Sequence, residues 1–267
     1  MSREPPAVLF ADADPSDLCS ARPPLGLLGA GRNDTLAHCI AYAQILLRAA
    51  NNGTHPRTPL VGGRCAIVGN SGSLLGDRRG SRIDHHDSVL RFNAAPSGGV
   101  WASDVGSKST VRILSSWVAK MRTWHRNDTR ATGDTTLLYC QSNWVGGCVH
   151  RGIHPSSAAL GQARRWLINP AFVRHVRDML VRSAHAPARP HTVLPSAGLL
   201  GVAIALRSCT RLTVVGFGNV STSNSTTSCE HYYECALSGG RLASEGRCAS
   251  TEGAQAFRNR SPRALAR

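Results

Sequence analysis

The stretch that decides the fold is Cys65–Lys108, CAIVGNSGSLLGDRRGSRIDHHDSVLRFNAAPSGGVWASDVGSK. It begins with a short apolar run, Cys65–Gly69, turns through small residues, and continues into a second apolar run, Ser88–Asn93. Apolar runs of this length are typical of parallel strands that are covered on both faces. The stretch therefore predicts a strand–loop–strand unit of an α/β sheet. Its backbone N–H groups and two asparagine amides lie where a phosphate and a ribose could bind.

The remainder of the chain continues this pattern. Further apolar runs have the length of short strands, and segments between them place apolar residues at helical spacing. This order predicts a single-domain α/β fold with a mostly parallel sheet flanked by helices. The further expected strands are Thr110–Ser115, Thr135–Cys140 and Leu212–Val215, and the expected helices are Thr35–Ala50, Ser156–Leu167, Pro170–Ser183 and Ala197–Arg207.

The composition divides the chain into three parts. Residues 1–60 are rich in Pro, Ala and Asn and predict a leader or stem-like segment with one helix. Residues 61–236 hold the α/β domain, and residues 237–267 predict a loosely structured basic tail with a helix near Glu252–Arg258. A chain of 267 residues is long enough to bury one good core.

The formal net charge of +15 is large for this length. It fits nucleic acid, an anionic membrane surface or a phosphorylated substrate as a partner. A basic composition spread over the chain explains it equally well, because no block of five like charges occurs. Five Phe, five Trp and four Tyr are too thinly spread to stack on bases, so we expect no nucleic-acid partner.

The cysteines and the glycosylation signals indicate a compartment. Nine cysteines occur without a C-x-x-C pair, which leaves a zinc knuckle or a thioredoxin-type site without support. Together with several N-x-S/T signals they favour an oxidising secretory compartment. These signals begin at Asn33, Asn52, Asn127, Asn219, Asn224 and Asn259.

The sequence shows neither an apolar run of about 18 residues nor a signal peptide at its start. A secretory location therefore implies a leader that this chain does not show, and a truncated gene model is one explanation.

Four short segments carry groups suited to binding a phosphorylated ligand. Gly69–Gly72 turns a strand end through small residues, Pro195–Gly198 opens a helix, and Gly216–Gly218 follows another strand. Strand ends and helix N-termini present backbone N–H groups to anions. Glu230–Glu234 adds His231, which can donate to a phosphate or move a proton. Taken singly, each segment is also explained as an ordinary turn, a helix cap or a solvated loop.

Taken together, the order and spacing of these segments resemble the eukaryotic-type sialyltransferases, glycosyltransferase family 29. Cys65–Lys108 is similar to the family's large motif through CAIVGNSGSLLG, IDHHDSVLRFNAAP and DVGSKST. Leu194–Gly218, with PSAGLLGVAIAL and VVGFG, is similar to the small motif, and His231–Glu234 is similar to the third motif. The resemblance covers about residues 60–235.

The resemblance implies a GT-A-like, Rossmann-like fold. It also implies an enzyme that transfers sialic acid from CMP-sialic acid to a hydroxyl of a glycoprotein or glycolipid acceptor, with inversion, without a metal and without a cofactor. The D-x-D at Asp12–Asp14 lies outside the matching region, and chance explains it better than a metal site. Family members are anchored in the Golgi membrane, so the Golgi lumen is the expected location, with the anchor absent from this chain.

The resemblance also assigns roles to residues. Asn70 and Asn93 match the asparagines that hold the phosphate and ribose of CMP, and His231 matches the histidine near the phosphate. Cys65 and Cys209 match the disulfide that joins the large and small motifs. The expected donor-binding residues are Gly69, Asn70, Ser71, Asn93, Ser196, Ala197, Gly198, Gly216, Gly218 and His231.

Breaking the bond between the sugar and the phosphate leaves negative charge on CMP. Backbone N–H groups, asparagine amides and a protonated histidine can stabilise that charge without a cation. A base must also remove the proton of the acceptor hydroxyl. The family uses for this a His that is followed five residues later by Glu. In this chain Arg247 stands where His is expected, while Glu252 fits, and arginine does not act as a base near neutral pH.

We therefore assign catalysis to His231 and Glu252, with three explanations of the departure left open. Another group, such as His231 or Glu234, serves as the base; the C-terminus of the sequence is mispredicted; or the chain binds a CMP-sugar without turning it over. A donor that carries another keto-sugar, such as Kdo, is a further alternative.

Overall fold

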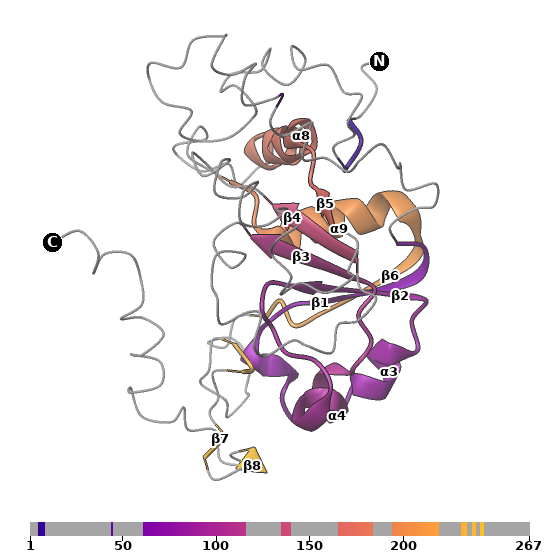
Figure 1. The fold of residues 1–267 in the computed structure, drawn as a ribbon, viewed down its shortest axis with the longest axis vertical. Helices are drawn as coiled ribbons and strands as arrows, with labels where there is room; N and C mark the ends of the chain where they lie inside the picture. The colour runs from indigo at the N-terminus through magenta and orange to yellow at the C-terminus, as the bar shows by residue number, and fades with distance from the viewer. Residues whose placement is uncertain are drawn as a thin grey trace, which may run out of the picture.

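The fold is a parallel sheet with helices on both faces (Figure 1). It is seen in a computed structural model. The structure describes residues 5–8, 44, 61–115, 135–139, 165–183, 194–218, 231–233, 237–238 and 241–242.

Six strands form this sheet in the order β5-β4-β3-β2-β1-β6, and every neighbouring pair is parallel. This is the expected GT-A-like α/β arrangement. Two further strands form a separate antiparallel pair. The strands are β1 (Gly63–Val68), β2 (Ser88–Phe92), β3 (Val111–Ser115), β4 (Thr135–Tyr139), β5 (Arg165–Leu167), β6 (Cys209–Val215), β7 (Leu237–Ser238) and β8 (Arg241–Leu242).

The helices divide between the two faces of the sheet (Figure 1). Two twelve-residue helices, α8 (Pro170–Val181) and α9 (Ala197–Ser208), lie on one face. Both begin at a side-chain cap, because Asn169 and Ser196 accept backbone N–H groups of the first turn. Two shorter helices lie on the other face. These are α3 (Gly80–Asp84) and α4 (Ala102–Val105), beside the 3-10 turns η2 (Gly72–Leu74) and η3 (Gly99–Trp101).

Alternate residues of β1 point into two separate apolar cores. Cys65 and Ile67 belong to the core beneath α8 and α9, whereas Ala66 and Val68 belong to the core beneath α3 and α4. All four side chains are at most 2% exposed. A strand covered on both faces reads as a continuous apolar run, which is why β1 was recognisable in the sequence.

One expected element is wrong in part. The helix predicted over Ser156–Leu167 ends in residues that form the strand β5, and the rest of that segment lies outside the described residues. Trp166 and Ile168 share one core, as alternate residues of a strand do. Three strand residues are too few to show a period of two, so pairing with β4 decides the structure here. Of the helix predicted over Thr35–Ala50 the structure describes Gln44 alone, which is helical, and the helix predicted near Glu252–Arg258 lies outside the described residues.

The N-terminal segment contributes to this end of the sheet. Val8 pairs with Ile168 in an antiparallel bridge and is 4% exposed. The backbone N–H of Asn169 donates to the carbonyl of Ala7 over 2.9 Å. Residues 5–8 therefore pack on the domain, and the division of the chain at residues 60 and 236 stays a prediction.

A disulfide joins Cys65 of β1 to Cys209 at the start of β6, the pairing that the family resemblance implies. The two Cα atoms lie 6.0 Å apart, although the residues are separated by 144 positions in the sequence. The bond connects neighbouring strands beneath the first core, where Cys65 is completely buried. It therefore closes a long loop of the unfolded chain across the central strand pair.

We expect Cys65→Ser to lower the free energy of unfolding by about 2–5 kcal/mol, because a closed loop of this length restricts the unfolded chain. Urea unfolding under oxidising conditions measures the loss. Cys209→Ser should lose the same amount, and the double variant no more than either single one. Wild-type stability in Cys65→Ser would contradict a structural role of the bond.

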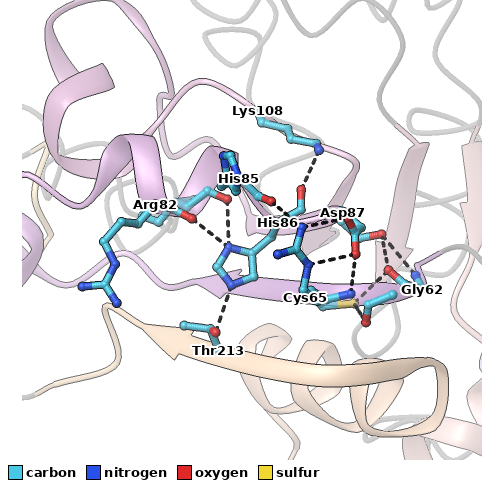
Figure 2. Close-up of polar contacts among 12 residues, drawn as sticks. Gly62, Cys65, Arg82, His85, His86, Asp87, Lys108 and Thr213 are labelled. Carbon is cyan, nitrogen blue, oxygen red and sulfur yellow. Dashed lines mark hydrogen bonds and ion pairs between the residues drawn. The ribbon is translucent and has the colours of Figure 1, made fainter.

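Polar contacts beside α3 tie β1, β2 and β6 together (Figure 2). The ring Nδ1 of His86 lies 2.9 Å from the carbonyl oxygen of Arg82, and its Nε2 lies 2.9 Å from Oγ1 of Thr213 in β6. A carbonyl only accepts, so Nδ1 carries a proton. Asp87 accepts the backbone N–H of Arg64 over 2.8 Å and pairs with its guanidinium over 3.4 Å. These contacts connect the start of β1 with the turn before β2.

The backbone N–H of Arg64, followed by its guanidinium, lowers the pKa of Asp87 below the ordinary 3.8. A lowered pKa means that the stabilising contribution is complete above the ordinary pKa and is lost as the pH falls below it. We expect Asp87→Asn to flatten the fall in unfolding free energy as the pH drops below about 4. Denaturant titrations of both proteins across that range test this, and identical pH slopes would contradict it.

Candidate functional site

The predicted site segments meet at the carboxyl edge of the sheet. Strands β1, β2 and β6 are parallel, so the residues after each strand emerge at the same edge. These residues are Gly69–Ser71, Asn93 and Gly216–Gly218. Helix α9 leads directly into β6 and runs back along the sheet, so its first turn lies at this edge too. Ligand sites of parallel α/β sheets form at such edges.

Two glycines let the β1 and β6 ends cross closely. The N–H of Gly69 donates to the carbonyl of Val215 over 2.8 Å, and the N–H of Ser71 donates to the carbonyl of Gly216 over 3.1 Å. A Cβ on Gly69 would lie 2.1 Å from the carbonyl oxygen of Gly216, which no side chain tolerates. Gly216 itself has a φ of +73°, a conformation that favours glycine. The large and small motifs are therefore joined through their backbones.

Asn93 is held in an unusual conformation with a defined orientation. Its φ is +50°, in the left-handed region that asparagine tolerates better than most residues. Its backbone N–H donates to the carbonyl of Ile113 over 2.8 Å. Its side-chain Oδ1 accepts the backbone N–H of Ser115 over 3.0 Å. Since a backbone N–H only donates, the atom facing Ser115 is the oxygen, and the side-chain NH₂ points elsewhere as a donor.

Asn70 presents the opposite group. Its backbone carbonyl accepts the N–H of Tyr232 over 3.0 Å. Its side-chain Oδ1 is buried and has no hydrogen-bond partner among the described residues. A buried acceptor without a partner costs about 1–3 kcal/mol, and a ligand hydroxyl or amine would remove that cost. Asn70 therefore offers an acceptor where Asn93 offers a donor.

The third motif is anchored on the large motif. His231 forms an antiparallel bridge with Ser71. The neighbouring Tyr232 is 1% exposed, its hydroxyl donates to the carbonyl of Pro96, and its ring packs edge-on against Trp101 with centroids 5.4 Å apart. The His231 ring stacks on Tyr233, with centroids 5.2 Å apart. This arrangement places a partly exposed imidazole beside the Ser71 backbone.

The first turn of α9 completes the edge. The exposed Ser196 caps the helix by accepting the N–H of Leu199 over 3.1 Å, and the hydroxyl of Tyr139 donates to the carbonyl of Pro195 over 2.9 Å. These contacts fix the direction of the free N–H groups at Ala197 and Gly198. An exposed N-terminus of this kind binds anions.

Phe217 is a site residue that the sequence-based assignment omitted. Its ring is 46% exposed and packs edge-on against Phe92, with centroids 5.8 Å apart. A Cβ on Gly198 would lie 2.6 Å from the Phe217 ring, so α9 approaches this ring closely. Phe217 thus connects the end of β6 with the α9 N-terminus and the end of β2. Its place between Gly216 and Gly218 was the signal available in the sequence.

The structure brings all ten expected donor-binding residues to this edge. Nine of them follow β1, β2 or β6 or begin α9, and His231 joins them through its bridge with Ser71. The other proposed catalytic residue, Glu252, the alternative base Glu234, and Arg247, which replaces the expected histidine, lie outside the described residues. Within the described part of the chain, no three His, Cys, Asp or Glu side chains gather as a metal site. No described helix is long and apolar enough to cross a membrane.

The fold and the edge define an α/β protein with a parallel sheet and a group of polar residues gathered at its carboxyl edge. Residues 41–240 match the sequence model of glycosyltransferase family 29 (sialyltransferase), and the chain belongs to this family.

Two curated relatives indicate the extent of the similarity. The human CMP-N-acetylneuraminate-beta-galactosamide-alpha-2,3-sialyltransferase 1 is 30% identical over 196 residues, which cover 68% of this chain and 51% of the relative. The chicken beta-galactoside alpha-2,6-sialyltransferase 2 is 28% identical over 188 residues, which cover 64% of this chain and 33% of the relative. The chain thus spans between a third and a half of the length of these relatives.

Solved structures show the same fold. A crystal structure of a mammalian sialyltransferase superposes with a TM-score of 0.59 at 25% identity and covers 87% of this chain and 80% of its own. Another, in complex with Gal-beta-1-3GalNAc-ortho-nitrophenol, gives a TM-score of 0.57 at 23% identity and covers 97% of this chain and 87% of its own.

We expect Gly69→Ala to lower the free energy of unfolding by about 2–3 kcal/mol, because its Cβ would push the β1 and β6 ends apart. Gly62→Ala is the matched control. Neither Gly69 nor Gly62 has a positive φ, and the nearest atom to the Gly62 Cβ position, the carbonyl oxygen of Ser208, lies at an ordinary 3.9 Å, so the expected loss is below about 1 kcal/mol. Chemical unfolding of both variants measures the two losses of stability. Equal losses would contradict the close approach of the β1 and β6 ends at Gly69.

Proposed function

We propose that this chain transfers sialic acid from CMP-sialic acid to a hydroxyl of a glycoprotein or glycolipid glycan, with inversion and without a metal or a cofactor. Membership of the family supports the general activity. The observation that carries the proposal is the meeting of the large, small and third motifs at one edge of the sheet, through the contacts of Ser71 with Gly216 and His231.

The two asparagines suit different parts of CMP. The side-chain NH₂ of Asn93 is the group left to donate, because its oxygen is engaged by Ser115. Phosphate oxygens accept such a bond. The buried Oδ1 of Asn70 needs a donor, and a ribose hydroxyl supplies one. The N–H groups that begin α9 add positive potential on the same edge.

The reaction requires charge to develop on both partners. The sugar becomes oxocarbenium-like as its bond to phosphate breaks, and CMP takes up the electron pair. Donors that already point at the phosphate stabilise this charge without reorganisation. In this proposal an imidazole N–H of His231, beside the Ser71 backbone, donates to the phosphate. Glu252, the other residue assigned to catalysis, and a base that takes the acceptor's proton, such as His231 or Glu234, are further parts of the proposal.

A second function has one specific observation in its favour. Arg247 stands where the family's catalytic histidine is expected, and an arginine does not accept a proton near neutral pH. The second candidate is therefore a CMP-sugar-binding protein without transferase activity. A transferase for CMP-Kdo would use the same CMP contacts.

The proposed location is the Golgi lumen. The Cys65–Cys209 disulfide forms in an oxidising compartment, and the N-x-S/T signals fit the same compartment. We propose no nucleic-acid partner, because the positive charge is spread over the chain and the aromatic residues are too few to stack on bases.

Incubation of the oxidised chain with CMP-sialic acid and a galactose-terminated acceptor distinguishes these functions. Release of CMP that depends on the acceptor and persists in EDTA supports the proposed enzyme. Tight CMP binding without release supports the binding protein. Release from CMP-Kdo alone identifies the other donor. Failure to bind CMP at all would refute all three.

We expect Asn93→Ala to weaken CMP binding at least about tenfold, because a hydrogen bond to a charged group contributes about 1.5–3 kcal/mol. Asn169→Ala is the matched control. Asn169 also accepts a backbone N–H through Oδ1, over 2.9 Å, but it caps α8 beside the edge strand β5. The control should lose about 1 kcal/mol of stability and keep its CMP affinity. Calorimetric titration with CMP measures the affinity of each variant. Equal CMP affinities in the two variants would contradict the role of Asn93.

A further inference from the structure

Arg112 is a buried cation in the centre of the sheet. It lies on β3 and is 1% exposed. Its Nη1 donates to the carbonyl of Asn93 over 3.0 Å and to the carbonyl of Ala95 over 2.9 Å. Removing a guanidinium from water costs several kcal/mol unless hydrogen bonds compensate, so these carbonyls are part of what makes its burial possible.

The same strand fixes Asn93 at three points. Ile113 accepts its backbone N–H, Arg112 donates to its backbone carbonyl, and Ser115 donates to its side-chain oxygen. The backbone bonds lie on either side of a residue with a φ of +50°, which costs about 1 kcal/mol for a residue other than glycine. The bond from Arg112 holds the turn from Asn93 to Ala95 in this conformation. The direction of the Asn93 side chain therefore depends on Arg112.

A neighbouring arginine serves a different loop. Arg91 on β2 is the register partner of Arg112 and is also 1% exposed. Its guanidinium donates to the carbonyls of Lys108, over 2.9 Å, and Val105, over 2.7 Å. Both arginines are therefore buried in the same sheet and both bond to backbone carbonyls. Arg112 bonds to the backbone of Asn93, whereas Arg91 bonds to carbonyls farther along the segment between β2 and β3, which makes Arg91 a suitable control.

We propose that Arg112 is a positioning residue for the nucleotide site. It does not touch the ligand and acts by holding the backbone of Asn93 so that the side-chain NH₂ faces the phosphate. This inference rests on the proposed binding of CMP at Asn93. Arg112, a buried residue of β3, would thus contribute to donor affinity without contacting the donor.

A double-mutant cycle with CMP as the ligand tests the proposal. The variants of the full chain are Arg112→Lys, Asn93→Ala and the pair together, with Arg91→Lys as the control. Lysine keeps the charge but replaces the planar fork with a shorter point donor. Ligand-observed NMR titration reaches millimolar dissociation constants, and thermal unfolding monitors stability. Arg112→Met provides a second variant that removes the donor altogether.

We expect Arg112→Lys to raise the dissociation constant of CMP about fivefold in the wild-type background and less than about twofold once Asn93 is alanine. Arg91→Lys should lower the melting temperature to a similar degree while CMP affinity changes less than about twofold. Equal losses of affinity in both arginine variants, or the same loss with and without Asn93, would overturn the proposal. A wild-type chain that does not bind CMP would overturn the proposed function and this inference with it.

Discussion

The parallel pairing of β1 with β6 is the constraint on which the rest of the structure depends. It runs from Gly63 to Val68 and continues past the strand ends through the bonds of Gly69 and Ser71 to the β6 side. The disulfide fastens the other end of the same pair. The groups at the candidate site are placed by this junction, by helix α9 or by the strands β2 and β3 beside it. The absence of a side chain at Gly69 is what allows the ends to cross.

The strands were predictable where burial on both faces produced an apolar run, as in β1 and β2. Their observed bounds differ from the predicted ones by one or two residues. Helices α3 and α4 were not predicted, because five and four residues do not complete enough turns to show a period. The prediction also missed β5, because its three residues gain their strand conformation from pairing with β4 rather than from their own sequence pattern.

The site was predictable as a set of segments but not as a set of directed groups. The family resemblance pointed to Asn70 and Asn93, yet nothing local shows that one presents an oxygen and the other an NH₂. That distinction comes from Ser115, which is far from Asn93 in the chain and adjacent in the sheet. Arg112 and Phe217 were missed for the same physical reason, because their effect on the site arises from register and packing.

The wide sequence separation across the β1–β6 junction bears on how the protein matures. The candidate site needs residues from both ends of the domain, so a ribosome-bound chain that has not yet released Cys209 has no complete site. Contacts between such distant residues form late, because a long loop must close first. A nucleotide that binds there recognises only the finished protein and shifts the equilibrium toward it. A nucleotide bound there would thus stabilise the completely folded chain relative to partly folded forms.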